Sequence, residues 1–168
     1  MKVSIATAFY LLSTLANAIP VDTETRATPS NAPITLENGP NASDSLTCGT
    51  KTYTGHEVYL AAQHGVNLGL VGETRGKAKY PHPFDNDDSK GNKLTFPKDC
   101  PADENRKEYP LKNGGVYDGG KSNTNQGDER VVYYEEPGEI GNDGHPLVYY
   151  CGIMTHHGAP TGGFLLCK

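Results

Sequence analysis

Two adjacent histidines, His156 and His157, lie at the end of an apolar run near the C-terminus of the chain. An imidazole changes charge near neutral pH, so it can give or take a proton during catalysis. Neighbouring residues of a β-strand point to opposite faces of the sheet. At most one of the two histidines is therefore expected to share a site with side chains on one sheet face. The predicted strand ends at His156, and His157 falls beyond it.

Three segments have the β-rich composition of strands: residues 107–111, 130–135 and 147–156. Alternation lets each strand place one ionisable group, Glu108, Arg130 or His156, on a common sheet face. On the last strand it groups four residues: Tyr150, Gly152, Met154 and His156. A carboxylate, a guanidinium and an imidazole are thereby expected to meet.

Together with His82, these residues form a set suited to cleaving RNA through its own 2′-OH. That reaction needs a base for the 2′-OH proton, an acid for the leaving 5′-oxygen and a cation for the phosphoryl charge. Glu or His can be the base, protonated His the acid, and Arg a bidentate phosphate clamp. Each residue taken alone is more often a solvated or ion-paired surface residue. The hypothesis therefore depends on their occurring together.

One helix and a sheet are predicted to position these residues. Thr54 and Glu57 match a capping box, and apolar residues then recur at helical spacing until Gly69. Two histidines on this helix are expected to be solvated: His56 and His64. The three strands follow, with a fourth at residues 164–167. This order predicts the α+β class, with one amphipathic helix packed on a central antiparallel β-sheet.

The N-terminal region divides into two predicted segments before the folded domain. Residues 1–18 have the basic start, apolar stretch and small-residue cleavage site of a secretory signal peptide. Residues 19–47 are rich in Pro, Thr, Ser and Asn, which predicts a disordered pro-segment or linker, and residues 48–168 form the predicted domain. Asn41 begins a glycosylation sequon. The formal charge of −5 offers no basic excess for holding nucleic acid by charge alone.

The cysteines are an even set in a chain that is expected to be secreted: Cys48, Cys100, Cys151 and Cys167. Secretion exposes them to an oxidising compartment, which predicts two disulfides. The C-x-x-C spacing of many zinc sites does not occur, so a structural zinc site is the weaker alternative. Spacing alone leaves all three pairings open.

Four ordered motifs resemble those of the small fungal guanyl-specific extracellular ribonucleases. They are KYPHPF at 79–84, KEYPL at 107–111, DERVVYY at 128–134 and CGIMTHHG at 151–158. The sequence also has features of a sister branch, the ribotoxins such as sarcin. The resemblance covers nearly all of residues 48–168 and implies the microbial ribonuclease fold.

The resemblance also implies a role for each candidate residue. Glu108 would be the general base that deprotonates the 2′-OH, and His82 would assist it. Arg130 would stabilise the phosphoryl charge, and His156 would be the general acid, which leaves His157 as a bystander. Two more residues are implied to contact the phosphate: Tyr80 and Phe164.

The segment after His82 is implied to bind guanine. Phe84 and Asn86 match the expected stacking and turn residues, and Asp88 is the candidate carboxylate for guanine N1–H and the exocyclic amine. The family more often has Glu and a second aromatic residue in this stretch. Two other acidic residues of the loop are expected to be solvated: Asp85 and Asp87.

The ribotoxin-like cysteine arrangement implies the pairs Cys48–Cys167 and Cys100–Cys151. The resemblance further implies a monomeric, secreted enzyme that acts on single-stranded RNA, needs no metal or other cofactor, and has no membrane partner. One alternative is a ribotoxin that cuts a single loop of large-subunit ribosomal RNA, which the acidic balance disfavours. The other is a non-catalytic secreted module that binds RNA or a protein, which the filled catalytic positions disfavour.

Overall fold

The computed structural model describes residues 31–87, 92–119 and 126–167 of the chain. The predicted signal peptide, residues 1–18, lies outside the described residues, as do residues 19–30 of the predicted pro-segment.

The single helix of the described residues, α1, spans Gly55–Leu70, where the sequence predicts a helix. The Thr54 hydroxyl accepts a hydrogen bond from the Glu57 N–H (3.2 Å), and the Glu57 carboxylate accepts one from the Thr54 N–H (2.8 Å). This reciprocal capping box satisfies two backbone donors that the helix would otherwise leave unpaired. None of the described helical structure is long and apolar enough to cross a membrane.

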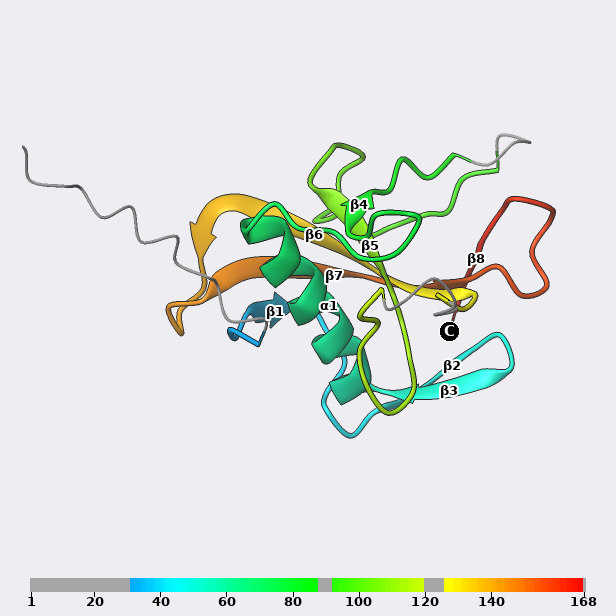
Figure 1. Cartoon of the computed structure of the whole chain (residues 1–168), viewed down its shortest axis with the longest axis horizontal. Coiled ribbons are helices and arrows are strands. Elements are labelled where there is room, and N and C mark those ends of the chain that lie inside the picture. Colours follow the sequence, from blue (N-terminus) through cyan, green and yellow to red (C-terminus); the bar gives the residue numbers. More distant parts are fainter. Residues whose placement is uncertain (1–30, 88–91, 120–125, 168) are drawn as a thin grey trace, which may run out of the picture.

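The main sheet has six strands and a largely antiparallel arrangement. Its members are β1 (Thr35–Glu37), β4 (His82–Pro83), β5 (Arg106–Pro110), β6 (Glu129–Ile140), β7 (Pro146–Thr155) and β8 (Leu165–Leu166). Across the sheet the order is β1-β7-β6-β5-β4, with β8 also pairing with β7. Only β1 runs parallel to its neighbour. The helix crosses the long strands (Figure 1), which confirms the predicted α+β class.

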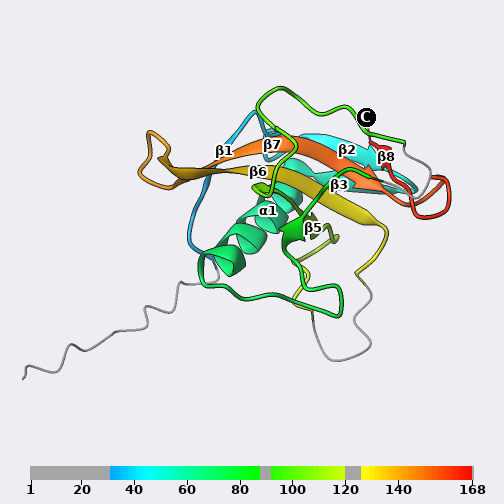
Figure 2. The same ribbon diagram turned by 90° about the horizontal axis from the view of Figure 1, so that it is seen from above.

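The two faces of the sheet bury different side chains. The helix-side cluster includes Val58, Ala62, Val66, Tyr109, Val131, Tyr133 and Ile153. The opposite face buries Phe84, Cys100, Val132, Tyr134, Cys151 and Met154. Figure 2 shows α1 on one side of β6 and β7. Glu108 and Arg130 alternate with helix-side residues, so both belong to the face opposite α1.

A β-bulge in β7 changes the face assignment that alternation predicts. Val132 pairs with Gly152, but the next residue, Tyr133, pairs with Tyr150, so β7 holds one extra residue at this point. Gly152 has φ +143°, a conformation that favours glycine. Tyr150 consequently packs with the helix-side cluster, whereas Met154 lies on the opposite face. The prediction that these two residues share a face is wrong.

The prediction of disorder for residues 19–47 is wrong for residues 31–47. Asn67 of α1 donates a hydrogen bond to the Ala32 carbonyl (2.8 Å), and Ile34 is buried against the helix. β1 then extends the sheet at β7, and β2 (Ser45–Cys48) forms a hairpin with β3 (Lys51–Thr54). A polar segment can be ordered here because it adds to an existing sheet and helix instead of building its own core.

Both disulfides implied by the family resemblance are confirmed. Cys48–Cys167 joins the β2–β3 hairpin to the chain after β8, and Cys100–Cys151 joins the β4–β5 loop to β7. The bridged cysteines are 119 and 51 residues apart in sequence. In the chain-entropy model, loops of these lengths correspond to about 5 and about 4 kcal/mol of stabilisation.

At Gly65, α1 lies directly against two tyrosines of the sheet. A Cβ there would be 2.5 Å from the Tyr133 hydroxyl and 3.1 Å from the Tyr109 ring, and both tyrosines are fully buried. Gly65→Ala is expected to lower the free energy of unfolding by about 1–2 kcal/mol, because overpacking outweighs the gain in helix propensity. Urea unfolding would measure the change. Gly69→Ala is the matched control: its Cβ meets nothing nearer than 3.4 Å, so a loss as large as that at Gly65 would contradict this explanation.

Candidate active site

A row of paired residues crosses three strands on the face opposite α1. His82 of β4 pairs with Glu108 of β5, and Glu108 pairs with Val132 of β6. Arg130 lies two residues before Val132 and therefore on the same face. Strand pairing thus brings together His82, Glu108 and Arg130, which are distant in the sequence.

Glu108 is a buried carboxylate, 5% exposed, beside an imidazole. Its Oε1 lies 3.3 Å from His82 Nε2, and its Oε2 has no hydrogen-bond partner among the described residues. Burial raises the pKa of the Glu108 carboxyl, although the charges of Arg130 and His82 act in the opposite direction. A carboxylate with a raised pKa and an unpaired oxygen is well suited to accept a proton.

Arg130 is fully buried and held by a tyrosine and by backbone carbonyls. Its Nε donates to the Tyr80 hydroxyl (2.9 Å), and its Nη1 donates to the carbonyls of Gly127 (2.9 Å) and Glu129 (2.8 Å). No described residue accepts a hydrogen bond from Nη2. Tyr80 also stacks on His82, with ring centroids 4.7 Å apart. Arg130 therefore places a fixed positive charge near the Glu108 carboxylate, whose pKa this charge acts to lower.

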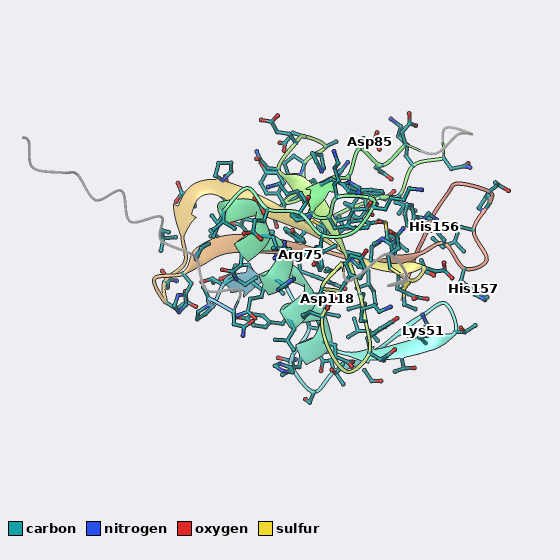
Figure 3. The ribbon with its side chains drawn as sticks, viewed as in Figure 1. Lys51, Arg75, Asp85, Asp118, His156 and His157 are labelled. Carbon is teal, nitrogen blue, oxygen red and sulfur yellow. A yellow bond between two sulfur atoms is a disulfide. The ribbon has the colours of Figure 1, made fainter. Side chains whose placement is uncertain are left out.

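His156 directly follows β7, and its ring is fixed by two contacts. Nδ1 lies 2.7 Å from the Gly163 carbonyl, to which it donates, and the ring stacks on Phe164 at a centroid distance of 3.7 Å. Because Nδ1 is committed to the Gly163 carbonyl, Nε2 is the nitrogen that can exchange a proton with a substrate. His157 is exposed, and Figure 3 shows it farther out, on the side of Lys51.

The order of the strands determines how Glu108, Arg130 and His156 are arranged relative to one another. β6 lies between β5 and β7, so Arg130 stands between the Glu108 carboxylate on β5 and the histidine that follows β7. A base and an acid on either side of a cation suit displacement at phosphorus, where one oxygen attacks as another leaves. Within the described ranges, no group of three or more His, Cys, Asp or Glu side chains is arranged to hold a metal ion.

A model of the ribonuclease family matches residues 41–168, a span that contains all four of these side chains. The chain belongs to this ribonuclease family. Guanyl-specific ribonuclease F1 of Fusarium fujikuroi is 31% identical over 124 residues, which are 74% of this chain and 77% of the relative. Guanyl-specific ribonuclease T1 of Aspergillus oryzae is 32% identical over 122 residues, 72% and 76% of the two chains. The extracellular guanyl-specific ribonuclease Fl1 of Gibberella baccata is 27% identical over 125 residues, 74% and 97% of the two chains.

In this member of the ribonuclease family, a small pocket lies between the segment after β4 and the segment before β8. It is lined by Phe84, Asn86, Asp87, Asn92, Leu94 and Phe164. Phe84 is only 7% exposed and packs edge-on against Phe164 at 5.6 Å, so its ring is a pocket wall and not an open stacking surface. Asn86 closes the loop by two hydrogen bonds with the backbone of Leu94, of 2.6 and 2.8 Å.

The other residues of the segment that is predicted to bind guanine fall into two groups. Asp85 and Asp87 are exposed, as the sequence predicts. Asp88, the candidate carboxylate for guanine, lies outside the described residues. The structure therefore brings Phe84, Asn86 and Phe164 together beside His156, whereas the role of Asp88 stays a prediction.

An ion pair between the half-exposed Lys51 and the buried Glu129, which was not expected from the sequence, holds the end of β7 in this ribonuclease. Glu129, 1% exposed, accepts hydrogen bonds from Lys51 (2.7 Å), Tyr53 (3.1 Å) and Thr155 (3.4 Å). Burial opposes ionisation, but the bonds from Lys51 and Tyr53 keep the pKa of the Glu129 carboxyl below its ordinary value. The Thr155 hydroxyl also accepts a hydrogen bond from the His157 N–H (3.0 Å). The network therefore includes the residues immediately before and after His156. A charged residue on the helix-side face of β6 was the signal that partners were needed.

Proposed function

We propose that this protein is a secreted endoribonuclease that cleaves single-stranded RNA, preferentially after guanosine, without a metal ion. One observation carries the proposal: the buried Glu108 carboxylate contacts His82, and Arg130 lies on β6, between the strand of Glu108 and the strand that leads to His156. Base, cation and acid are thus supplied by side chains alone.

The proposed reaction is a transphosphorylation that conserves a phosphate ester. Glu108, assisted by His82, takes the proton of the 2′-OH while the 2′-oxygen attacks the adjacent phosphorus. The bond from phosphorus to the 5′-oxygen breaks, and His156 Nε2 gives its proton to that oxygen. Arg130 and the Tyr80 hydroxyl stabilise the charge on the phosphoryl oxygens. The products are a 2′,3′-cyclic phosphate end and a 5′-hydroxyl end, and slow hydrolysis of the cyclic ester follows.

Guanine preference is proposed on two grounds. The relatives are named guanyl-specific, and the pocket beside His156 is lined by residues of the segment that the family uses for the base. Asp88 is proposed as the carboxylate that accepts from guanine. Secretion is supported by the sequence pattern of residues 1–18 and by the relative that is named extracellular. Asn41 is exposed, which suits a glycan on a secreted monomer.

Mapping the RNA ends made by the purified disulfide-bonded domain in EDTA would test this function. A defined single-stranded RNA is expected to be cut after most accessible guanosines, with cyclic phosphate ends. Activity that disappears in EDTA and returns with a divalent ion would contradict the mechanism. A single cut in intact ribosomes, with little cleavage of free RNA, would favour the ribotoxin. No cut by folded protein would favour a binding module.

A further inference from the structure

We infer that Arg106 is a positioning residue for the base pocket and sets how strongly the enzyme prefers guanine. The inference rests on the proposed function. Arg106 begins β5, two residues before Glu108 and on the same face, and only 3% of it is exposed. Its side chain contacts Phe84, which lines the pocket, and two other parts of the β4–β5 loop.

Arg106 binds Phe84 through both its backbone and its side chain. The Phe84 N–H donates to the Arg106 carbonyl (2.8 Å), and Arg106 Nε donates to the Phe84 carbonyl (3.1 Å). The bond from a charged donor is stronger than one between neutral groups. Phe84 is the first pocket residue after β4, so these two bonds fix where the pocket wall begins.

The same guanidinium holds two further parts of the β4–β5 loop. Nη1 donates to the Cys100 carbonyl (3.3 Å), and the guanidinium carbon lies 5.1 Å from the Phe96 ring centroid and 5.9 Å from that of Phe84. Phe84 and Phe96 meet edge-on at 5.8 Å. Arg106 therefore sits among aromatic rings and ties the pocket wall to the Cys100–Cys151 disulfide.

Burial disfavours the charge of Arg106 and lowers its pKa, although the charges of Asp103 and Asp85 act in the opposite direction. The Nη2 of Arg106 is buried and has no hydrogen-bond partner among the described residues, which is unfavourable for a charged donor. An unbranched apolar side chain such as Met could pack against Phe84 and Phe96 without that penalty. What Met could not supply is the hydrogen bond to the Phe84 carbonyl.

The expected effect is on base binding more than on proton transfer. Phe84 contacts Phe164, and Phe164 stacks on His156, but the Gly163 carbonyl holds the imidazole independently. Loosening Phe84 would therefore widen the pocket and leave the acid oriented. KM for guanine substrates should rise, and kcat should change little.

Two variants test the inference: Arg106→Lys, which keeps the charge, and Arg106→Met, which keeps the packing. Each would be assayed on dinucleotides that carry guanine or adenine on the 5′ side of the cleaved bond. The guanine-to-adenine ratio of kcat/KM is expected to fall by about tenfold, a change of about 1.4 kcal/mol in discrimination, mainly through KM. The acidic and alkaline limbs of the pH profile of kcat should stay at the same pH values as in the wild type.

The neighbouring residue supplies a matched control. Lys107 points to the other face of β5, where it pairs with Glu135, so Lys107→Met should leave the base ratio unchanged. An unchanged ratio in folded Arg106→Lys, with normal guanine preference in the wild type, would overturn this inference alone. Wild-type protein that cleaves neither dinucleotide would overturn the proposed function and this inference with it.

Discussion

Replacing His156 by alanine is expected to lower kcat for RNA cleavage by about a thousandfold, within the range that general acid catalysis supplies. The reason is local: with Nδ1 committed to the Gly163 carbonyl, only Nε2 is left to protonate the 5′-oxygen as it leaves. KM should change little, because the pocket and Arg130 remain. Initial rates on a guanosine dinucleotide would measure both parameters.

The leaving group and the adjacent histidine provide two controls for this prediction. A substrate whose leaving group is a phenolate with a low pKa needs no proton, so His156→Ala should cleave it nearly as fast as the wild type. His157→Ala should be nearly silent on either substrate, since His157 is exposed beyond the strand end. Equal losses of activity in the two alanine variants would show that the assignment of His156 as the general acid is wrong.

Local signals in the sequence predicted those elements whose structure depends on near neighbours. The capping box at Thr54 and Glu57 starts α1 as expected, because both partners lie within one turn. The failures involve contacts that are distant in sequence. His64 was expected to be solvated, but it is buried with its ring 5.6 Å from Tyr109 of β5. Residues 31–34 were expected to be disordered because nothing in their composition shows that α1 will receive them.

The candidate site shows the same division. Alternation within each strand placed Glu108 and Arg130 on one face, but it could not give the pairing that puts His82 opposite Glu108. The bulge in β7 could not be predicted from alternation, because alternation assumes a constant period of two residues. Arg106 was missed for a further reason. Alternation assigns a face, but it does not show that a loop will cover a charge on that face.

Glu108→Gln is expected to lower kcat/KM by about a hundredfold, less than the loss for His156→Ala. Glutamine cannot accept the 2′-OH proton, but His82 Nε2 lies 3.3 Å from the same carboxyl and can take over part of that role. The double variant with His82→Ala should therefore lose most of the remaining activity.

In the wild type, the acid limb of the pH profile should lie above the ordinary carboxyl range, because burial raises the pKa of Glu108. An acid limb within the ordinary range would contradict the assignment of Glu108 as the base.

Glu108→Gln is also expected to stabilise the fold at neutral and alkaline pH. Because burial raises the pKa of Glu108 above its value in the unfolded chain, the folded state binds this proton more tightly. The wild type therefore loses stability as the pH rises through the folded-state pKa, whereas glutamine stays neutral and loses none. Urea unfolding of both proteins should show the variant more stable at pH 8, with the difference shrinking as the carboxyl becomes protonated in acid. A variant less stable than the wild type at pH 8 would mean that the ionised carboxylate is needed to hold Arg130 and His82, and that Glu108 is kept for structure as well as for catalysis.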